Sequence, residues 1–251
     1  MFLETKNPHV RDKRIKFFER GHKYEIDKKG GYMSVTTFNH SQFEKFNPDL
    51  VIQNMMQSKK WPKSEYFGKT PEEIKRIWNK RGTEAATAGT NLHNDIEKCY
   101  NNLKYENESI EFTYFLNFKK DFPNLEAYRT EWFVFDEEHK LAGSIDMCFQ
   151  DTETGEMDIY DWKRSKEIKK NSSFMKFSKT ECISHIPDLN FWHYSLQLNT
   201  YKWMLEKNYD KKIRDMYLVC LHPNFDNYIL YKVPNLQKEI SQLAVMRKCN
   251  I

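Results

Sequence analysis

The hydrophobic pattern of this chain changes from a helical period to a period of two near residue 128, and no other feature restricts the fold as much. Segments 128–135, 141–149 and 157–162 alternate between apolar and polar residues or run apolar. The connections between them, residues 136–139 and 151–155, are short and polar, which is typical of turns. The pattern therefore predicts three consecutive antiparallel strands.

Helices are predicted both before and after these strands in the sequence. Thr70, followed by Pro71 and two glutamates, is an N-cap signature, and the helix that opens there is expected to end at Gly82. In the next helix, Gly89 is expected to let a neighbouring element approach closely. The predicted helices are Pro48–Gln57, 71–80, 83–103, 108–122, 193–208 and 235–248.

The remaining segments complete a single α/β domain. Two further strands are predicted at 213–221 and 228–233, and a short hairpin of 24–26 with 32–35 is predicted around two glycines. Residues 164–190 are polar, basic and aperiodic, so we expect a long functional loop there. Helices, three strands, a helix, two strands and a helix indicate one α/β domain with a helical N-terminal extension.

Composition excludes several classes of protein. Hydrophobic residues make up 39% of the 251 and aromatic residues 15%, too much apolar material for a disordered chain. Apolar runs are far shorter than the roughly 20 residues of a membrane helix, and the first 20 residues lack an apolar signal segment. We therefore expect a globular protein with no membrane partner, located in the cytoplasm or nucleus.

Residue counts add three expectations. Twenty Asn against six Ala is typical of an AT-rich genome such as that of a large DNA virus, and the location would then be the interior of the host cell. The five cysteines are scattered without a C-x-x-C pair, which argues against a zinc ribbon or a disulfide scaffold. The net charge of +4 is too small, taken alone, to indicate a nucleic-acid binder.

The sharpest local feature is a pair of acidic motifs on neighbouring strands. Gly143-Ser144-Ile145-Asp146 is followed by Asp161-Trp162-Lys163, and both acids are expected at the ends of adjacent strands. Two carboxylates that converge on one point suit a hard divalent cation such as Mg²⁺ or Mn²⁺, which clamps a phosphate and activates a water. Lys163 lies two residues beyond Asp161, so both side chains are expected on one face.

Two helical segments supply candidate partners for these acids. Gly89-Thr90-Asn91-Leu92-His93 places His93 four residues before Glu97 on one helical face. Gln197 and Tyr201 are likewise separated by four residues in the next predicted helix. Each pair alone is more simply interpreted as a helix surface, and it is the combination with the two acidic motifs that indicates a site.

Taken together, these four motifs resemble the PD-(D/E)xK nucleases. The similar branch includes RecB-type nuclease domains, phage lambda-type exonucleases and the mitochondrial genome-maintenance exonuclease. The resemblance covers residues 89–201 and runs through G-T-x-L-H, G-S-x-D, D-W-K and Q-x-x-x-Y in that order. Ile145 stands where the family's name-giving proline would be, although this branch often lacks that proline.

The resemblance implies a fold and a set of roles. It implies a restriction-endonuclease-like core with a central mixed sheet flanked by helices, over residues 83–251, and an N-terminal hairpin and helical extension over 1–82. It implies Lys163 as the catalytic lysine, Gln197 and Tyr201 as the residues that position it and the phosphate, and Glu131 as a further acid. The implied ligands of Mg²⁺ or Mn²⁺ are His93, Asp146, Asp161 and the backbone carbonyl of Trp162.

Charge distribution indicates where DNA would bind. Residues 131–162 carry ten acids and one lysine, a net charge of −9, whereas residues 163–179 carry seven cations and one acid, a net charge of +6. Cations beside a metal site are well placed to hold phosphates in a salt-dependent way. The predicted DNA-binding residues are Arg164, Ser165, Lys166, Lys169, Lys170, Lys176 and Lys179.

Aromatic residues in and after this basic segment have two interpretations. Phe174 and Phe177 lie among the cations and Trp192 follows them. Such rings stack on unpaired bases in single-stranded DNA-binding proteins, and they equally serve to anchor a loop to the core. The sequence leaves both interpretations open.

The leading hypothesis is a metal-dependent deoxyribonuclease that acts as an exonuclease on DNA ends or single strands in recombination, repair or replication. The sequence has no Walker-type motif, so any helicase or other recombination or replication protein would be a separate partner chain. Two alternatives stay open. One is an RNA-cleaving endonuclease on the same scaffold, and the other is a catalytically silent nucleic-acid-binding subunit.

Overall fold

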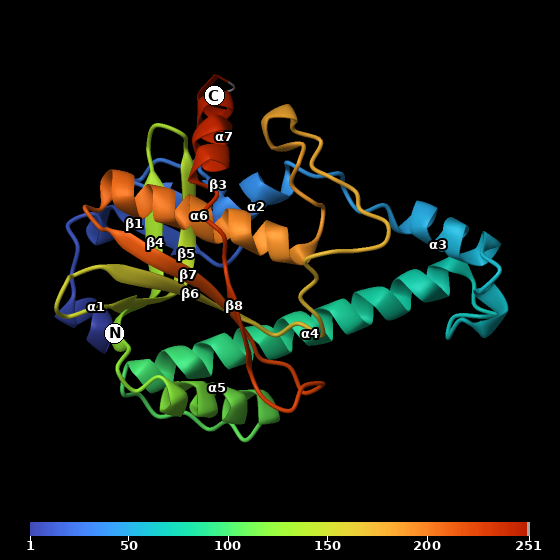
Figure 1. Ribbon diagram of the computed structural model, residues 1–251, viewed down its shortest axis with the longest axis horizontal. Coiled ribbons are helices and arrows are strands. Elements are labelled where there is room, and N and C mark those ends of the chain that lie inside the picture. Colours follow the sequence, from blue (N-terminus) through green and yellow to red (C-terminus); the bar gives the residue numbers. More distant parts are fainter. Residues whose placement is uncertain (250–251) are drawn as a thin grey trace.

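The protein is built on a mixed β-sheet of six strands flanked by helices (Figure 1). The structure is a computed structural model that describes residues 1–249. Strand β4 pairs along the whole of β5, whose other edge is shared by β3 at its start and β6 at its end. The strands are β3 (Met33–Ser34), β4 (Glu126–Asp136), β5 (Leu141–Gln150), β6 (Met157–Lys163), β7 (Ile213–Cys220) and β8 (Ile229–Lys232).

The sequence-based prediction of three consecutive antiparallel strands is confirmed. Strands β4, β5 and β6 form an antiparallel meander, as the period of two indicated. Strand β7 then pairs parallel to β6, and β8 returns antiparallel to β7. The parallel step requires a crossover, which the chain makes through a long loop and a helix.

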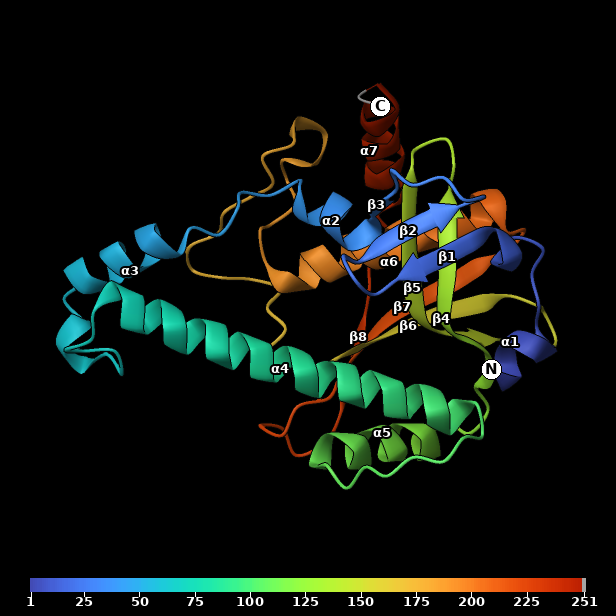
Figure 2. The ribbon, with the colours of Figure 1, turned by 180° about the vertical axis from the view of Figure 1, so that it is seen from behind.

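Helices cover both faces of this sheet. Helices α2 and α6 pack on one face, with α7 against α6, and α4 and α5 lie along the other face (Figures 1 and 2). Two hydrophobic clusters fill the two interfaces, and the second is dominated by aromatic rings of α5 against β5 and β6. The helices are α2 (Val35–His40), α4 (Pro71–Tyr100), α5 (Ile110–Asp121), α6 (Asn190–Asn208) and α7 (Gln237–Cys249).

The N-terminal hairpin is not the one predicted. Strands β1 (Ile15–Phe18) and β2 (Lys23–Ile26) pair with each other through a turn in which Gly21 and His22 have positive φ angles of 88° and 49°. The predicted pairing of 24–26 with 32–35 is wrong because β3 pairs parallel to β5 instead. The side chain of Ser34 then caps α2, so the extended chain ends there.

Helix α4 is one continuous helix, and the predicted end at Gly82 is wrong. A capping box at Thr70 and Glu73 opens it, and it continues for 30 residues through both Gly82 and Gly89. The proposed division between residues 82 and 83 therefore falls inside a helix. The expectation that Gly89 admits a close neighbour is also wrong, since a Cβ atom there would meet nothing within 4 Å.

The first half of α4 projects from the body of the protein together with α3 (Pro48–Gln57) and the short helix η2 (Trp61–Lys63) (Figure 1). We call residues 48–81 the arm. Trp78 of α4 packs against Phe46 and Tyr66, and Arg81 donates two hydrogen bonds to the carboxylate of Glu65. These contacts join the arm into one unit at the far end of α4.

The segment between β6 and α6 is a long irregular loop, as the sequence indicated. It contains one short helix, η3 (Glu181–Ile183). Ile183 and Ile186 are buried, and the hydroxyl of Ser178 donates a hydrogen bond to the carbonyl of Gln42. The second half of the loop is therefore anchored to the core. Across residues 1–249, no helix combines the length and the apolar character needed to cross a membrane.

Candidate metal centre

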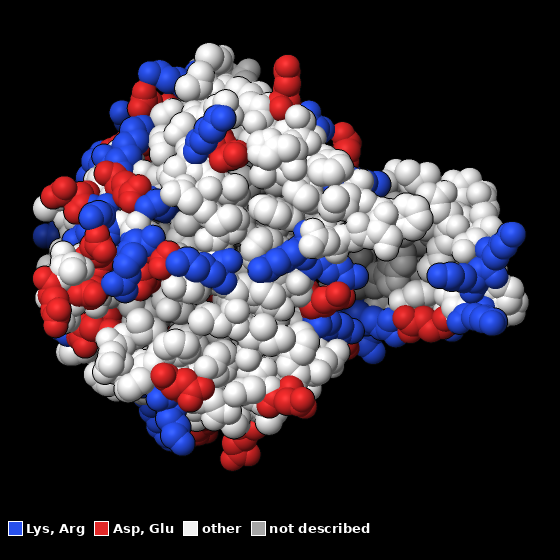
Figure 3. Space-filling model, in the orientation of Figure 1, with Lys and Arg blue, Asp and Glu red and all other residues white. Residues whose placement is uncertain are grey.

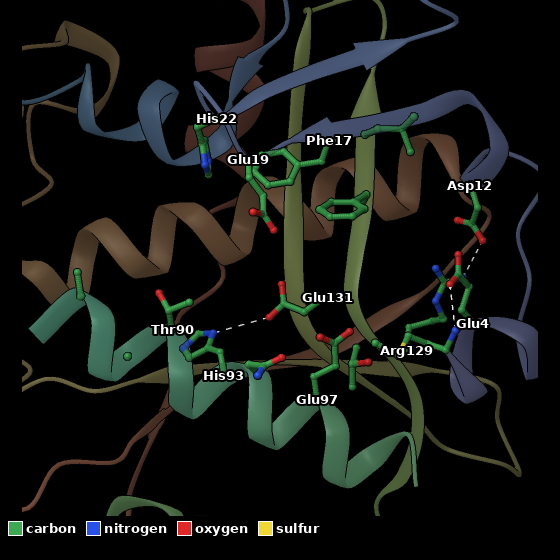
Figure 4. A pocket seen from close by; sticks show the side chains of 17 residues that line it. Glu4, Asp12, Phe17, Glu19, His22, Thr90, His93, Glu97, Arg129 and Glu131 are labelled. Carbon is green, nitrogen blue, oxygen red and sulfur yellow. Dashed lines mark hydrogen bonds and ion pairs between the residues drawn. The ribbon is translucent and has the colours of Figure 1, made fainter. Parts of the chain in front are cut away.

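Three side chains from three different elements meet at one point on the α4 side of the sheet. His93 comes from α4, Glu131 from β4 and Asp146 from β5, and one ligand atom of each lies within 4.8 Å of the others. The Nδ1 atom of His93 is 3.8 Å from a Glu131 oxygen and 3.5 Å from an Asp146 oxygen. Figure 4 shows His93 and Glu131 facing each other across a cavity.

Strand register explains why the carboxylates converge. Thr130 pairs with Met147 and Trp132 with Ile145, so Glu131 stands directly opposite Asp146. Residues opposite each other in an antiparallel pair are the closest side-chain neighbours in a sheet. The next pairing, Met147 with Tyr160, extends by one residue to place Asp161 beside Asp146 on the following strand.

Backbone irregularities in β4 and β5 direct these side chains toward one another. Glu131 has a φ angle of +42°, in the left-handed region that non-glycine residues rarely adopt, and such strain is typical of functional sites. Strand β5 also changes face here, because Ile145 packs in the cluster with α6 whereas Met147 packs in the cluster with α4 and α5. The Ser144 hydroxyl donates a 2.8 Å hydrogen bond to Glu131 Oε2 and fixes that carboxylate.

Asp146 lies in the middle of β5 rather than at a strand end as the sequence suggested. It falls between the stretch of β5 that pairs with β3 and the stretch that pairs with β6. Its Oδ2 atom accepts a 3.0 Å hydrogen bond from the backbone N–H of Trp162. Burial raises the pKa of Asp146 even though the neighbouring cations His93 and Lys163 oppose the shift.

His93 is held in one orientation. Its Nε2 atom donates a 2.8 Å hydrogen bond to the backbone carbonyl of Trp162, so Nδ1 is the ring nitrogen that faces Glu131 and Asp146. Burial alone would lower the pKa of His93, but the two carboxylates outweigh it and raise the pKa to about 9. The structure thus places the Trp162 carbonyl, a predicted metal ligand, against the imidazole rather than within the three-residue group.

Asp161 and Lys163 form an ion pair beside this group. Asp161 is 2% exposed, and its Oδ2 atom contacts the Lys163 ammonium but has no hydrogen bond of normal geometry to residues 1–249. Burial is the main cause that raises the pKa of Asp161 to about 6. For Lys163 burial acts in the opposite direction, yet the charges of Asp161 and Asp146 raise its pKa, so the side chain stays an ammonium.

Helix α6 presents the two predicted positioning residues to the same region. Tyr201 is 3% exposed, shares a hydrogen bond with Gln197, and has its pKa raised by burial. A Cβ atom at Gly143 would lie 2.7 Å from the Tyr201 hydroxyl. The absence of a side chain at Gly143, the glycine of G-S-x-D, therefore lets the Tyr201 ring pack directly against the backbone of β5.

The predicted DNA-binding residues differ widely in their surroundings. Arg164 is tied to Glu111 of α5 by a 2.6 Å hydrogen bond, and both side chains are largely buried. The hydroxyl of Ser165 bonds within the loop, and Lys169 pairs with Glu167. The remaining four predicted cations are all exposed: Lys166, Lys170, Lys176 and Lys179.

The aromatic residues of the loop also separate. Phe174 is 93% exposed and anchors nothing, whereas Phe177 forms an isolated β-bridge with Pro187. Trp192 donates a hydrogen bond from its indole to the Lys170 carbonyl and so holds the start of the loop against α6. Exposure thus favours the stacking interpretation for Phe174, and contacts favour the anchoring interpretation for Trp192.

A cavity of about 820 Å³ opens beside the three-residue group, between α4, β4 and the β1–β2 hairpin (Figure 4). Its lining is strongly acidic, and the one arginine in it, Arg129, is paired with Asp12. The carboxylates that line it are Glu4, Asp12, Glu19, Glu97 and Glu131. A phosphate entering this cavity needs a countercharge.

The donor set fits a hard divalent cation. It offers one imidazole nitrogen and two carboxylates within one coordination sphere, and the second imidazole nitrogen is already oriented by a backbone carbonyl, as in many metal sites. Asp161, on the neighbouring strand, adds a further carboxylate beside the group, and its Oδ2 atom contacts the Lys163 ammonium. These residues define a partly buried group able to hold a metal ion.

Two residues of the site were missed from the sequence. Ser144 holds Glu131, and the Tyr194 ring lies 4.8 Å from the Lys163 ammonium as a cation–π partner. Tyr194 precedes Gln197 by three residues and Tyr201 by seven, so helical spacing was the signal that would have found it.

Comparison with known proteins adds little to this geometry. No family profile and no curated protein matches the sequence. Among solved structures, the protein named SSO0001 is similar over 89% of this chain and 77% of its own, with 16% identity and a TM-score of 0.38. A protein of Eubacterium rectale that carries the name of a proposed exonuclease is similar over 61% of this chain and 69% of its own, with 13% identity and a TM-score of 0.30. Likenesses at these TM-scores assign neither a fold nor an activity to this chain.

Proposed function

We propose that this protein is a metal-dependent deoxyribonuclease with a restriction-endonuclease-like core of the PD-(D/E)xK type. The observation that carries the proposal is the group formed by His93, Glu131 and Asp146, with the Asp161–Lys163 ion pair directly beside it. Acids, an imidazole and an ammonium at one point match the needs of phosphodiester hydrolysis, in which both a cation and a separate positive charge act on the phosphate.

The chemistry divides between the cation and the chain. A bound Mg²⁺ or Mn²⁺ supplies Lewis-acid stabilisation of phosphate charge and lowers the pKa of water. His93 Nδ1, Glu131 and Asp146 would hold it, with Asp161 as an additional ligand. An imidazole among carboxylates suits Mn²⁺ at least as well as Mg²⁺.

Lys163 acts as a fixed positive charge rather than as a base. Its raised pKa keeps it protonated at neutral pH, and Tyr194 and Asp161 hold its ammonium in place. A preorganised ammonium stabilises the negative charge that develops on the phosphate oxygens in the transition state. Gln197 and the buried Tyr201 would position this lysine and the substrate phosphate, the roles that the resemblance implies.

The proposed substrate is DNA. The protein would act as an exonuclease, from duplex ends or along single strands, in recombination, repair or replication. Exposed Lys166, Lys170, Lys176 and Lys179, with Phe174 among them, supply phosphate contacts and a ring for an unpaired base. A separate recombination or replication protein is the expected partner, in the cytoplasm or nucleus of the cell or of a viral host.

Cleavage of end-labelled DNA in Mg²⁺ and in Mn²⁺ tests the proposal. Asp146→Asn and Lys163→Met are each expected to lower the rate at least about 100-fold, because each removes a charge that acts on the transition state. Lys238→Ala, on the exposed face of α7, is the matched control and keeps full activity. EDTA abolishes cleavage by every variant.

Labelled linear and circular substrates of DNA and RNA identify the mode of action. Cleavage of linear but not circular DNA supports an exonuclease. Preferential cleavage of RNA, or tight EDTA-insensitive DNA binding without turnover, contradicts the proposal. Activity retained in both folded variants, purified free of other nucleases, contradicts it equally.

A further inference from the structure

The arm carries a group of lysines that no carboxylate neutralises. Lys59, Lys60 and Lys63 are exposed, and none of them forms an ion pair with any residue between 1 and 249. The arm as a whole contains eight Lys and Arg against four Asp and Glu. Figure 3 shows Lys and Arg side chains gathered at this projecting end. By contrast, Arg164 and Lys169 near the metal centre are already paired.

The α4 helix that joins the arm to the metal centre crosses open space. Residues 79–87 are exposed on every side of the helix, although helices normally owe their stability to packing on at least one face. Within it, residues 82–87 are small apart from Glu84, and a Cβ atom at Gly82 would meet nothing within 4 Å. Glycine inside a helix costs about 1 kcal/mol relative to alanine, and no close packing contact requires a glycine at position 82.

The length of this connection matches a dimension of DNA. Twenty-two residues separate Pro71, at the arm end of α4, from His93 at the metal centre. At about 1.5 Å per residue they span about 33 Å. One helical turn of B-DNA is about 34–36 Å. A duplex that presents one phosphate to the metal centre therefore presents the equivalent phosphates of the next turn at the arm.

We propose that the arm is a second DNA-binding surface, which holds duplex DNA about one helical turn from the His93–Glu131–Asp146 group through Lys59, Lys60 and Lys63. Residues 82–87 of α4 then lie along the duplex, where their side chains, all small except that of Glu84, leave room for the sugar–phosphate backbone. This inference rests on the proposed function, because it takes the phosphate at the metal centre as its reference point.

Binding of labelled duplexes of about 6 to 20 base pairs in EDTA tests the inference without cleavage. Wild-type protein is expected to gain affinity once the duplex exceeds about 10 base pairs. The variant Lys59→Ala/Lys60→Ala/Lys63→Ala keeps its affinity for short duplexes and loses that gain. Losing three phosphate contacts lowers the salt slope by about 2.7, so between 50 and 200 mM salt wild-type binding to a long duplex weakens about 40-fold more than that of the variant.

A matched control removes three exposed lysines elsewhere: Lys104→Ala/Lys120→Ala/Lys238→Ala. This control is expected to keep the length-dependent gain. Equal affinities of the arm variant and wild type at all lengths overturn the inference, as does an equal gain with single strands. A change in the solution mass of the arm variant, with its DNA binding unchanged, assigns the arm to contacts between copies and overturns it too.

Failure of the proposed function gives a different result. If the protein binds long duplexes through the arm but cleaves no DNA in Mg²⁺ or Mn²⁺, the inference about the arm stands and the proposed nuclease function is contradicted. If the protein cleaves DNA and the arm lysines contribute nothing to binding, the nuclease assignment stands and the inference about the arm is overturned.

Discussion

Two glycines of this chain are expected to respond to alanine substitution with opposite signs. At Gly143, a Cβ atom would lie 2.7 Å from both Cε1 and the hydroxyl oxygen of Tyr201 and 3.1 Å from its Cζ atom. The Tyr201 ring is 3% exposed and is carried by a helix packed across the sheet, so it has no free volume into which to move. At Gly89, the same atom would meet nothing within 4 Å.

The expected magnitudes follow from these surroundings. Overpacking a filled core costs about 1–3 kcal/mol, so Gly143→Ala should destabilise the protein by that amount. Gly89→Ala sits in a helix interior with free space and should stabilise the protein by about 0.5–1 kcal/mol through helix propensity. For a chain of this size each kcal/mol corresponds to about 2–4 °C in Tm.

Urea denaturation followed by circular dichroism measures both variants against wild type under one condition. Equal m-values confirm that the midpoints report stability rather than a change in the unfolded state. A loss smaller than about 0.5 kcal/mol for Gly143→Ala would mean that Tyr201 does not rest on Gly143. A destabilised Gly89→Ala would mean that α4 is not a regular helix through that position.

Two further outcomes are expected. Asp136 is buried, and although burial opposes the shift, hydrogen bonds from Lys207, Asn208 and His139 lower its pKa. Its folded pKa lies below the unfolded value of about 3.9, so its stabilisation is complete above that pH and is lost as the pH falls through the folded pKa. Asp136→Asn should lose about 1–3 kcal/mol at pH 7 and show a shallower loss of stability on acidification, measured by urea unfolding from pH 2 to 7. Ser144→Ala frees the Glu131 carboxylate and should weaken Mn²⁺ binding about 10-fold in calorimetry, with Ser144→Thr restoring much of it; an unchanged affinity would exclude an orienting role.

Periodicity predicted most of the secondary structure of this chain. A period of two predicts the meander of β4 to β6, and the helices α3, α5 and α6 lie where the sequence predicts helices. The break assigned to Gly82 failed because a single glycine costs only about 1 kcal/mol, which a capping box and 30 residues of helix outweigh. Local sequence does not contain that balance.

The N-terminal hairpin failed for a different reason. The sequence predicts the turn at Gly30 and Gly31, whereas the turn that forms uses Gly21 and His22 with positive φ angles. Met33 and Ser34 pair instead with β5, more than a hundred residues away in the sequence. Pairing at that separation depends on tertiary packing, which a window of sequence does not encode.

The candidate metal centre was predicted in part. The strand pattern predicts Asp146 and Asp161 on adjacent strands, and helical spacing predicts His93 and Glu97 on one face of a helix. That Glu131 stands opposite Asp146, while Asp161 turns to Lys163, depends on strand register and on the positive φ of Glu131. The roles carried over from the resemblance, including the Trp162 carbonyl as a ligand, stay predictions.

The hydrogen bond between His93 and the Trp162 carbonyl also has a consequence for linkage. One imidazole joins α4 to β6 through Nε2 and faces the carboxylates of β4 and β5 through Nδ1, while the same helix carries the arm at its other end. A tilt of α4 that changes how the arm meets the proposed duplex must therefore also move His93, a proposed ligand of the cation. Linkage is reciprocal, so the factor by which DNA on the arm alters cation affinity equals the factor by which the cation alters affinity for that DNA.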